Sequence, residues 1–433
     1  MTVDTVAPSD LVGRAHEWMR ENWSPDLTVG EWWERLGLAG WAAPMLPVEW
    51  YGCGASSEDA ALIARTVGAC GALRAPVGVG LGFAGPVIAY HGSLEQKERY
   101  LRDIVTGRAG WCQLFSEPGA GSDLAGLTTR AVKDGDEWVV NGQKVWTSNA
   151  MYADFAILLA RSDPDVPKHQ GITYFVLHMD QPGVEVRPLR EMNGRSEFNE
   201  VFLTDARVHH DDIVGGVDNG WAMARATLAY ERAMIGTGGS GVGFPGAEPG
   251  AKTGALGQRC SEFTAPGAVM PKARGSFVDF GFLLELARAL GKDADPLVRQ
   301  DLARLYILDE IARVTTLRGR ALREVGQEIP GLGNLAKLSR TRYVKLTRDA
   351  GMRIAGPAGT LHAYDDPAGQ TVLDDATGIP VLAKLTDAVL FAQGSSIYGG
   401  TDEIQRNVVG EQVLGLPREP SNDRSVPFRD LAR

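Results

Sequence analysis

The chain has 433 residues, of which 44% are apolar and 23% charged, and this ordinary globular usage excludes disordered, collagen-like and coiled-coil proteins. The 44 Lys and Arg against 54 Asp and Glu give a net charge of −10, so nothing global favours nucleic acid or an anionic membrane surface. No apolar run reaches the ~18–20 residues of a membrane span, and the N-terminus lacks a signal-peptide pattern. We therefore expect a cytoplasmic protein of two to four structural units.

Residues 1–108 are predicted to form an N-terminal helical domain. Apolar spacing and Pro, Gly and Ser punctuation predict helices at 11–22, 29–36, 58–71 and 94–105. The last of these follows Ser93 and Gln96, which have the spacing of a capping box. Residues 37–54 are predicted to be a long loop, because they contain repeated Pro and Gly.

Residues 109–217 are predicted to form a middle antiparallel β domain. Short runs rich in Val, Ile, Tyr and Phe predict strands at 137–140, 155–160, 172–177, 184–187 and 200–203. Turn signals stand at Asp134, Asn141 and Pro182, each of which is directly followed by a glycine. Several short strands at this spacing are typical of a compact sheet.

Residues 218–433 are predicted to form a C-terminal helical bundle, so the fold class is α+β, mainly α. Helical spacing recurs at 221–235, 277–290, 296–328, 335–355, 381–392 and 402–414. Between Gly236 and Gly275 lies a Gly-rich insertion with 11 glycines in 40 residues and no apolar periodicity. Such a segment is a lid, an interface element or a mobile loop, and we expect a mobile loop.

Metal and disulfide chemistry are not indicated. The four cysteines, Cys53, Cys70, Cys112 and Cys260, are widely spaced and lack clustered His partners, so we expect free thiols. The adjacent pair His209 and His210 follows a predicted strand, where neighbouring side chains point to opposite faces. We therefore predict no metal site.

The first motif with chemical meaning is the segment from Gln113 to Asp123, which reads QLFSEPGAGSD. It joins a strand-like end to a turn with two glycines, so backbone N–H groups and the Ser122 hydroxyl can approach a planar or anionic ligand. An ordinary glycine turn, with Ser122 or Asp123 capping a helix, is the structural alternative.

The second motif runs from Asn141 to Asn149 and reads NGQKVWTSN. Trp146 and Ser148 are two residues apart on a predicted strand, so both point to one face and Thr147 to the other. An aromatic wall beside a hydroxyl donor suits an aromatic cofactor. The alternative is that Trp146 fills the core.

The third motif runs from Tyr398 to Asn407 and reads YGGTDEIQRN. A glycine turn precedes a helix that Thr401 can cap, with Asp402 and Glu403 in its first turn. The positive end of that helix is suited to an anion or a cofactor, although an unoccupied helix start would have the same sequence.

In order and separation the three motifs resemble those of the acyl-CoA dehydrogenase family of flavoproteins, and the likeness extends from about Trp32 to Pro420. The resemblance implies a helix, sheet and helix fold, bound FAD, and α,β-dehydrogenation of an acyl-CoA or similar acyl thioester to the trans-2-enoyl thioester in lipid metabolism. It also implies an electron-transferring flavoprotein as acceptor, and an oligomer of identical chains or a heteromer with a related chain.

The resemblance also assigns residues to roles. Carried over by position, the contacts with FAD are Gln113, Phe115, Ser116, Ser122, Trp146, Ser148, Thr401 and Glu403. Ser122 also lies near the pantetheine arm of the substrate, and the backbone at Gly399 and Gly400 contacts the thioester.

The catalytic base is assigned by a departure from the pattern. Many family members carry the base where this chain has Gly399, which has no side chain. A second branch of the family draws it from a helix at the start of the C-terminal region, immediately before an arginine, and this chain has Glu231 and Arg232 there. Glu231 is therefore the candidate base and Arg232 its neighbour for orientation and charge balance, while a solvated Glu-Arg pair is the structural alternative.

A second departure concerns the assembly. Many homo-oligomeric relatives carry an Arg-x-x-Phe-Gly-like element that reaches FAD across a subunit interface, and this chain has no match to it. Two alternatives to the dehydrogenase therefore stay open: a flavin-dependent monooxygenase on the same scaffold, and a non-catalytic partner subunit of a heteromeric dehydrogenase.

Overall fold

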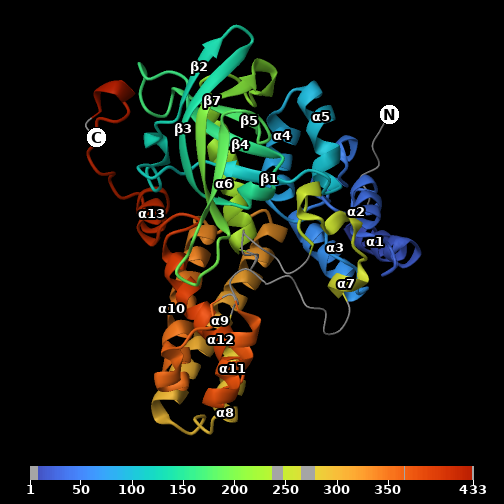
Figure 1. Ribbon diagram of the computed structural model, residues 1–433, viewed down its shortest axis with the longest axis vertical. Helices are drawn as coiled ribbons and strands as arrows, with labels where there is room; N and C mark the ends of the chain where they lie inside the picture. The colour runs from blue at the N-terminus through green and yellow to red at the C-terminus, as the bar shows by residue number, and fades with distance from the viewer. Residues whose placement is uncertain (1–7, 237–246, 265–277, 365, 432–433) are drawn as a thin grey trace.

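The computed structural model describes residues 8–236, 247–264, 278–364 and 366–431. Helices come first, a sheet follows, and a second set of helices closes the chain, which confirms the predicted fold class (Figure 1). The N-terminal helices lie beside the sheet, and the C-terminal bundle extends away from both (Figure 1). Within the described residues no helix is long and apolar enough to cross a membrane.

The N-terminal helices begin at capping residues that the sequence contains. They are α1 (Pro8–Asn22), α2 (Val29–Leu38), α3 (Ser57–Ala69), α4 (Gly85–His91) and α5 (Leu94–Val105). Ser93 and Gln96 form the predicted capping box of α5, and Thr28 and Glu31 form a second one at α2. Helix α4 was not predicted. It follows a π-helical turn over Gly80–Ala84. A side chain at Gly80 would collide with Trp111, so this glycine permits close packing and does not end a helix.

The sheet has seven strands: β1 (Trp111–Leu114), β2 (Arg130–Asp134), β3 (Glu137–Ser148), β4 (Phe155–Arg161), β5 (Ile172–His178), β6 (Val184–Leu189) and β7 (Phe198–His209). The strands are hydrogen-bonded in the order β1, β4, β2, β3, β7, β6. Strand β5 lies outside this order and pairs with β4. Most neighbours are antiparallel, while β1 and β2 each pair with β4 in parallel, which corrects the expectation of a purely antiparallel sheet.

The turn predicted at Asn141 is wrong. Strand β3 continues through Asn141 and Gly142, with an irregular register against β7 between Val140 and Gly142. A Cβ at Gly142 would collide with the Thr129 side chain, so this glycine permits a close approach of two backbones within the sheet. A single long strand therefore carries the second motif as far as Ser148.

The C-terminal part consists of α6 (Gly220–Gly236), α7 (Ser261–Thr264), α8 (Phe280–Ala289), α9 (Pro296–Glu324), α10 (Leu332–Ala355), α11 (Pro367–Thr377), α12 (Leu382–Phe391) and α13 (Asp402–Val408). Helix α11 was not predicted. The helix expected over 402–414 changes to a π-helical turn at Val409–Val413, so its second half has a different face from the one that a regular helix would present.

Part of the Gly-rich insertion is packed, which corrects the expectation of a mobile loop for residues 247–264. Val29 donates its N–H to the Gln258 carbonyl, and Cys260 donates to the Leu27 carbonyl, both at 2.9 Å. Phe263 is buried among the N-terminal helices. Residues 237–246 and 265–277 lie outside the described residues.

Helix α6 lies where the three parts meet. One core cluster joins α4 and α5, the β1, β4 and β5 strands, and Met223 and Ala224 of α6. Another fills the bundle of α8, α9, α10 and α12. Because α6 packs on the first cluster and also contacts α10, it places its side chains between the sheet and the bundle.

Candidate active site

The segment after β1 is fixed by a buried ion pair. The Lys144 ammonium donates to the Glu117 carboxylate at 2.9 Å and to the Phe115 carbonyl at 3.0 Å. Its side chain is 0% exposed and that of Glu117 is 5% exposed. Glu117 also accepts from the backbone N–H groups of Thr128 and Thr129 at 2.7 and 2.9 Å. The first motif is thereby tied to the strand that carries the second.

The electrostatics of this pair favour the charged form of Glu117. Burial alone would raise its pKa, but the Lys144 ammonium and the hydrogen bonds from Thr129 and Thr128 outweigh burial and lower the pKa to about 2. The stabilisation that Glu117 contributes is therefore complete above its ordinary pKa of ~4.3 and is lost as the pH falls toward about 2.

Trp146 is held in an uncommon conformation that turns its ring outward. Its φ is 60°, and the register between β3 and β7 shifts between Lys144 and Thr147. The side chain is 57% exposed and meets the Phe198 ring edge-on at 5.8 Å, whereas Thr147 is buried. A bulky residue at positive φ is a genuine outlier and is concentrated at functional sites. Trp146 therefore does not fill the core.

Glu231 on α6 faces the first motif and α10. Its carboxylate accepts a hydrogen bond from Gln113 and interacts with the Lys337 ammonium. The side chain is partly buried. Burial raises the pKa of Glu231 above its ordinary value, while Arg232, the Gln113 bond and Lys337 oppose that rise. A carboxylate with this balance is a stronger base than a solvated one.

Lys337 also links Glu231 to the third motif. Its ammonium donates to the Ser395 carbonyl at 2.6 Å and the Thr341 hydroxyl at 3.2 Å. It lies 5.5 Å from the centroid of the Tyr398 ring. The side chain is 4% exposed. One buried cation thus joins the candidate base to the turn that precedes α13.

The glycine turn of the third motif requires its glycines. Gly399 and Gly400 have φ values of 64° and 84°, and a Cβ at Gly400 would lie 2.5 Å from the Gln405 amide nitrogen. Gln405 donates to the Gly399 carbonyl at 2.9 Å and accepts from Asn334 at 2.6 Å. Thr401 caps α13 through the Ile404 N–H, as predicted.

The other sequence-derived candidates differ in what they can offer to a ligand. Ser122 is exposed, and the Glu403 side chain is 77% exposed beside Arg406. Phe115 is buried against Tyr174, so its ring belongs to the core. Asp123 starts a 3-10 turn without capping it and instead pairs with Lys168 at 2.9 Å. The capping alternative for Asp123 is therefore not observed.

The polar groups around these motifs fit a planar ligand with hydrogen-bonding edges, as the flavin is. The Ser116 and Ser148 hydroxyls have no protein hydrogen-bond partner within the described ranges. The buried atoms Ser396 Oγ, just before the third motif, and Asp402 Oδ1, within it, also have none in the part of the chain that the structure describes. Together with the outward-facing Trp146 ring, they provide contacts that the protein itself does not use.

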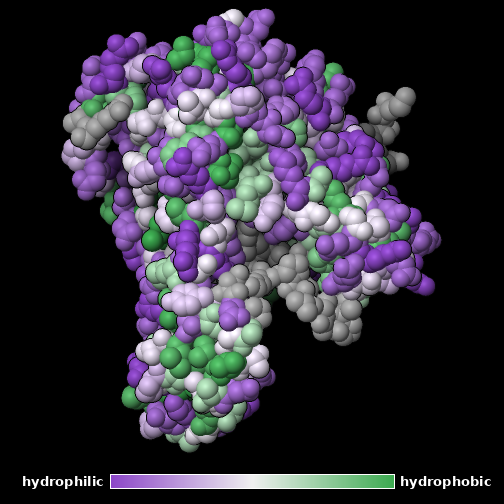
Figure 2. Space-filling model, viewed as in Figure 1, coloured by the Kyte–Doolittle hydropathy of each residue, from purple (hydrophilic) through white to green (hydrophobic). Residues whose placement is uncertain are grey.

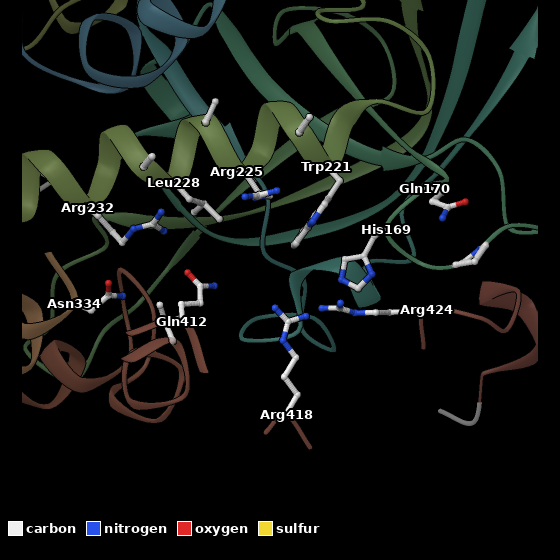
Figure 3. Close-up of a pocket in the computed structure, with 15 residues that line it drawn as sticks. His169, Gln170, Trp221, Arg225, Leu228, Arg232, Asn334, Gln412, Arg418 and Arg424 are labelled. Carbon is white, nitrogen blue, oxygen red and sulfur yellow. The ribbon is translucent and has the colours of Figure 1, made fainter. Parts of the chain in front are cut away.

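A large cavity runs along the face of α6 that carries Trp221, Arg225 and Arg232 (Figure 3). Its volume is about 940 Å³, and it lies between α6, the loop joining β4 and β5, α10, the end of α13 and the C-terminal tail. Trp221 stands at one end of the α6 face and Arg232 at the other (Figure 3). The base candidate and this cavity are therefore joined through adjacent residues of one helix.

Sequence reasoning did not find several of these residues. The sequence around Lys337 and Gln405 did not indicate that these side chains are buried. Lys337 bonds Ser395 and Gln405 bonds Asn334, and both partners come from other segments of the chain. Arg418 and Arg424, which line the cavity, follow the last predicted helix and carried no periodic signal.

Three family models cover the chain one after another. They describe the N-terminal domain of acyl-CoA dehydrogenase over residues 1–108, the middle domain over 112–206 and the C-terminal domain over 287–414. The class that they define is that of flavoprotein oxidoreductases. The chain belongs to the acyl-CoA dehydrogenase family, which confirms the resemblance drawn from the three motifs.

Similar proteins span most of the chain. Acyl-CoA dehydrogenase IpdE1 of Mycobacterium tuberculosis is 33% identical over 94% of this chain and 91% of its own length. Acyl-CoA dehydrogenase FadE34 of the same organism is 36% identical over 88% of this chain, which spans only 46% of that relative.

Solved structures show the same architecture. The steroid acyl-CoA dehydrogenase Tcur3481-Tcur3483 superposes with a TM-score of 0.68 at 26% identity, over 97% of this chain and all of the other. The ChsE4-ChsE5 complex of Mycobacterium tuberculosis gives a TM-score of 0.63 at 25% identity over the same shares.

Proposed function

We propose that the chain catalyses FAD-dependent α,β-dehydrogenation of an acyl-CoA, with Glu231 as the base. The observation that carries this proposal is the position of Glu231, whose carboxylate is partly buried and bonded to Gln113 at the end of β1. Gln113 belongs to the first motif, and Lys337 links the same carboxylate to the third. A base of raised pKa at the meeting point of cofactor motifs is what α-proton removal requires.

Each residue has one task in this reaction. Glu231 takes the α proton, while Arg232 and Lys337 favour the ionised form of its carboxylate. The N–H groups of Gly399 and Gly400 are suited to stabilise the charge that develops on the thioester oxygen. FAD, when bound, supplies the acceptor for the hydride that leaves the β carbon.

The FAD would be held by the residues that the resemblance assigned. Trp146 offers a ring face, and Ser148, Ser116 and Ser122 offer hydroxyls. Gln113, Thr401 and Glu403 offer polar groups from β1 and the start of α13, and Phe115 contributes only through its backbone.

Replacing Trp146 tests this placement. Because the ring is exposed and makes one aromatic contact, Trp146→Ala leaves the thermal unfolding of the FAD-free protein within about 2 °C of the parent's. Loss of the stacking surface weakens FAD binding about tenfold, since an aromatic pair contributes ~0.5–1.5 kcal/mol beyond area. Fluorescence titration of the FAD-free protein measures the affinity. Trp138→Phe, a buried change in the same sheet, is the control; unchanged affinity in Trp146→Ala would remove Trp146 from the site.

Lys337 is expected to set the pH range of activity. Its positive charge lowers the pKa of Glu231, so Lys337→Met raises that pKa and leaves less of the base ionised at a given pH. The acid limb of the rate of flavin reduction therefore moves to higher pH. Thr341 still donates to the Ser395 carbonyl, which limits damage to the fold. The exposed Lys133→Met is the matched control, and an acid limb that stays in place in Lys337→Met contradicts the coupling.

The partner is proposed to be a related dehydrogenase chain, either a second copy or a different one. Helix α9 exposes Ile307, Ile311, Val314 and Leu317, which recur every three or four residues on one face. Figure 2 shows hydrophobic side chains gathered on the C-terminal bundle. Light scattering of the chain expressed alone and with a related chain distinguishes the two assemblies, and a monomer in both cases would refute the proposal.

Anaerobic mixing with acyl-CoA thioesters of different chain types tests the activity itself. We expect loss of the oxidised flavin absorbance and formation of the enoyl thioester, followed by reoxidation by an electron-transferring flavoprotein. An oxidised spectrum that persists with every thioester, in the assembled protein, refutes the dehydrogenase. Oxygen consumption driven by added reduced flavin would instead support the monooxygenase.

A further inference from the structure

Trp146 lies in a β-bulge, which turns its ring away from the sheet. Between Lys144 and Thr147 of β3, two residues stand opposite a single residue of β7. The two are Val145 and Trp146, and Trp146 has the positive φ of 60° there. Because a bulge re-aims the side chains within it, the direction of the Trp146 ring depends on what fixes the bulge.

The first residues of β7 hold the bulge from the partner strand. Phe198 pairs with Ser148, and its ring meets the Trp146 ring edge-on. Directly after β3, the Asn149 N–H donates to the Glu197 carbonyl at 3.2 Å. The position of residues 197 and 198 therefore sets the position of the Trp146 ring.

The loop that joins β6 to β7, residues 190–197, is closed by its own hydrogen bonds. The Glu191 N–H donates to the Arg195 carbonyl at 2.8 Å, and the Glu191 carboxylate accepts from the Glu197 N–H at 2.9 Å. The Asn193 side-chain oxygen accepts from the Arg195 N–H at 3.1 Å. Because its two ends are bonded to each other, a contact that fixes Arg195 also fixes the start of β7.

A buried ion pair binds this loop to the C-terminal bundle. The Arg195 guanidinium lies 3.1 Å from the Asp387 carboxylate of α12, and the two side chains are 12% and 7% exposed. The Asn193 amide donates to the other oxygen of Asp387 at 3.4 Å. Helix α12 belongs to the bundle core through Leu382 and Leu385. In Figure 1 the loop extends from the sheet toward the bundle, so the pair joins two separate parts of the fold.

We propose that Arg195 and Asp387 are positioning residues for the cofactor site. Their ion pair docks the 190–197 loop on the bundle, the loop fixes the start of β7, and β7 holds the bulge so that the Trp146 ring faces the flavin. Because both charged groups are withdrawn from water, removing one of them weakens the docking strongly. The proposal rests on the proposed function only in taking Trp146 as a contact of FAD.

Hydrogen exchange of the FAD-free protein tests this coupling without any ligand. Asp387→Asn removes the carboxylate charge and keeps an acceptor for Asn193, while Glu197, at 3.4 Å, still balances the Arg195 charge. We expect the backbone N–H groups of residues 145–149 to exchange about tenfold faster, because the bulge opens more often once the loop is released. Arg195→Met breaks the same pair from the loop side and is expected to raise the same exchange.

Asp301→Asn is the matched control. Asp301 of α9 pairs with Arg353 of α10 at 2.7 Å, and its side chain is 14% exposed, so this pair also joins an aspartate and an arginine at a shielded position. It links two helices of the bundle. Asp301→Asn therefore lowers the stability of the bundle without releasing the loop, and exchange at residues 145–149 stays at the parent's rate.

Fluorescence titration with FAD shows whether the ion pair acts through the Trp146 ring. We expect Asp387→Asn to weaken FAD binding about tenfold, as Trp146→Ala does. Two independent losses of that size would multiply to about a hundredfold in the variant that carries both changes. Because the pair acts through the ring, we expect the double variant to bind FAD within about threefold of Trp146→Ala alone.

Three outcomes overturn the coupling. One is exchange at residues 145–149 that stays within about twofold of the parent's in both Asp387→Asn and Arg195→Met. Another is an equal acceleration in Asp301→Asn, which would assign the effect to general stability. The third is a double variant whose loss of FAD affinity is the product of the two single losses. If exchange rises as expected but the parent protein binds no FAD, the proposed function fails and the coupling between the loop and the bulge stands.

Discussion

Glu231→Gln is expected to retain its FAD and to lose flavin reduction by acyl-CoA at least ~10²-fold, because general base catalysis contributes about 10²–10⁴. Glutamine has the size of glutamate and still accepts a hydrogen bond from Gln113, so packing at the end of β1 is preserved. Rapid mixing under anaerobic conditions measures the reduction rate directly.

Two comparisons make this result specific to the base. Glu98→Gln, an exposed carboxylate on α5, changes the same chemical group away from the site and leaves the rate unchanged. FAD content and the dissociation constant for CoA report whether Glu231→Gln disturbs binding rather than proton transfer. A variant with normal binding and a rate within threefold of the parent's would take Glu231 out of the mechanism.

Lys144→Met is expected to destabilise the protein by about 3–5 kcal/mol, since it leaves the Glu117 carboxylate buried without its counter-charge. The same change releases the Phe115 carbonyl and so loosens the first motif, and we expect weaker FAD binding as well. Urea unfolding followed by far-UV circular dichroism measures the free energy of unfolding.

A second substitution separates the lost charge from the lost packing. Adding Glu117→Gln to Lys144→Met removes the uncompensated charge and keeps an acceptor for the Thr128 and Thr129 N–H groups, so part of the stability returns. If the double variant is less stable than Lys144→Met alone, the pair does not act through its charges.

Local signals in the sequence predicted the fold well where they are complete in themselves. The capping box at Ser93 and Gln96 placed α5 at its observed ends, because the donors and acceptors of that helix start are all within four residues. The Asn141-Gly142 pair misled for the opposite reason. Its glycine, Gly142, serves a contact with Thr129, thirteen residues away in the chain, which no local pattern contains.

The same distinction between local signals and contacts across distant segments applies to the residues of the candidate site. The three motifs carried the family resemblance, the resemblance drew attention to Glu231, and the structure brings Gln113, Glu231 and Lys337 together. Lys337, Arg418 and Arg424 had no signal, since their position beside α6 comes from tertiary packing across segments more than a hundred residues apart. The outward turn of Trp146 depends on a register shift against β7, which strand alternation alone does not encode.

Exchange of the substrate's α hydrogens tests the central claim most directly. A thioester with sulfur in place of the β carbon can lose an α proton to Glu231 but has no β hydrogen to transfer, so proton removal is observed by itself. In deuterated buffer the parent protein is predicted to exchange the α hydrogens at least ~10²-fold faster than Glu231→Gln, as followed by proton NMR. Equal exchange rates in the two proteins would show that another group takes the proton.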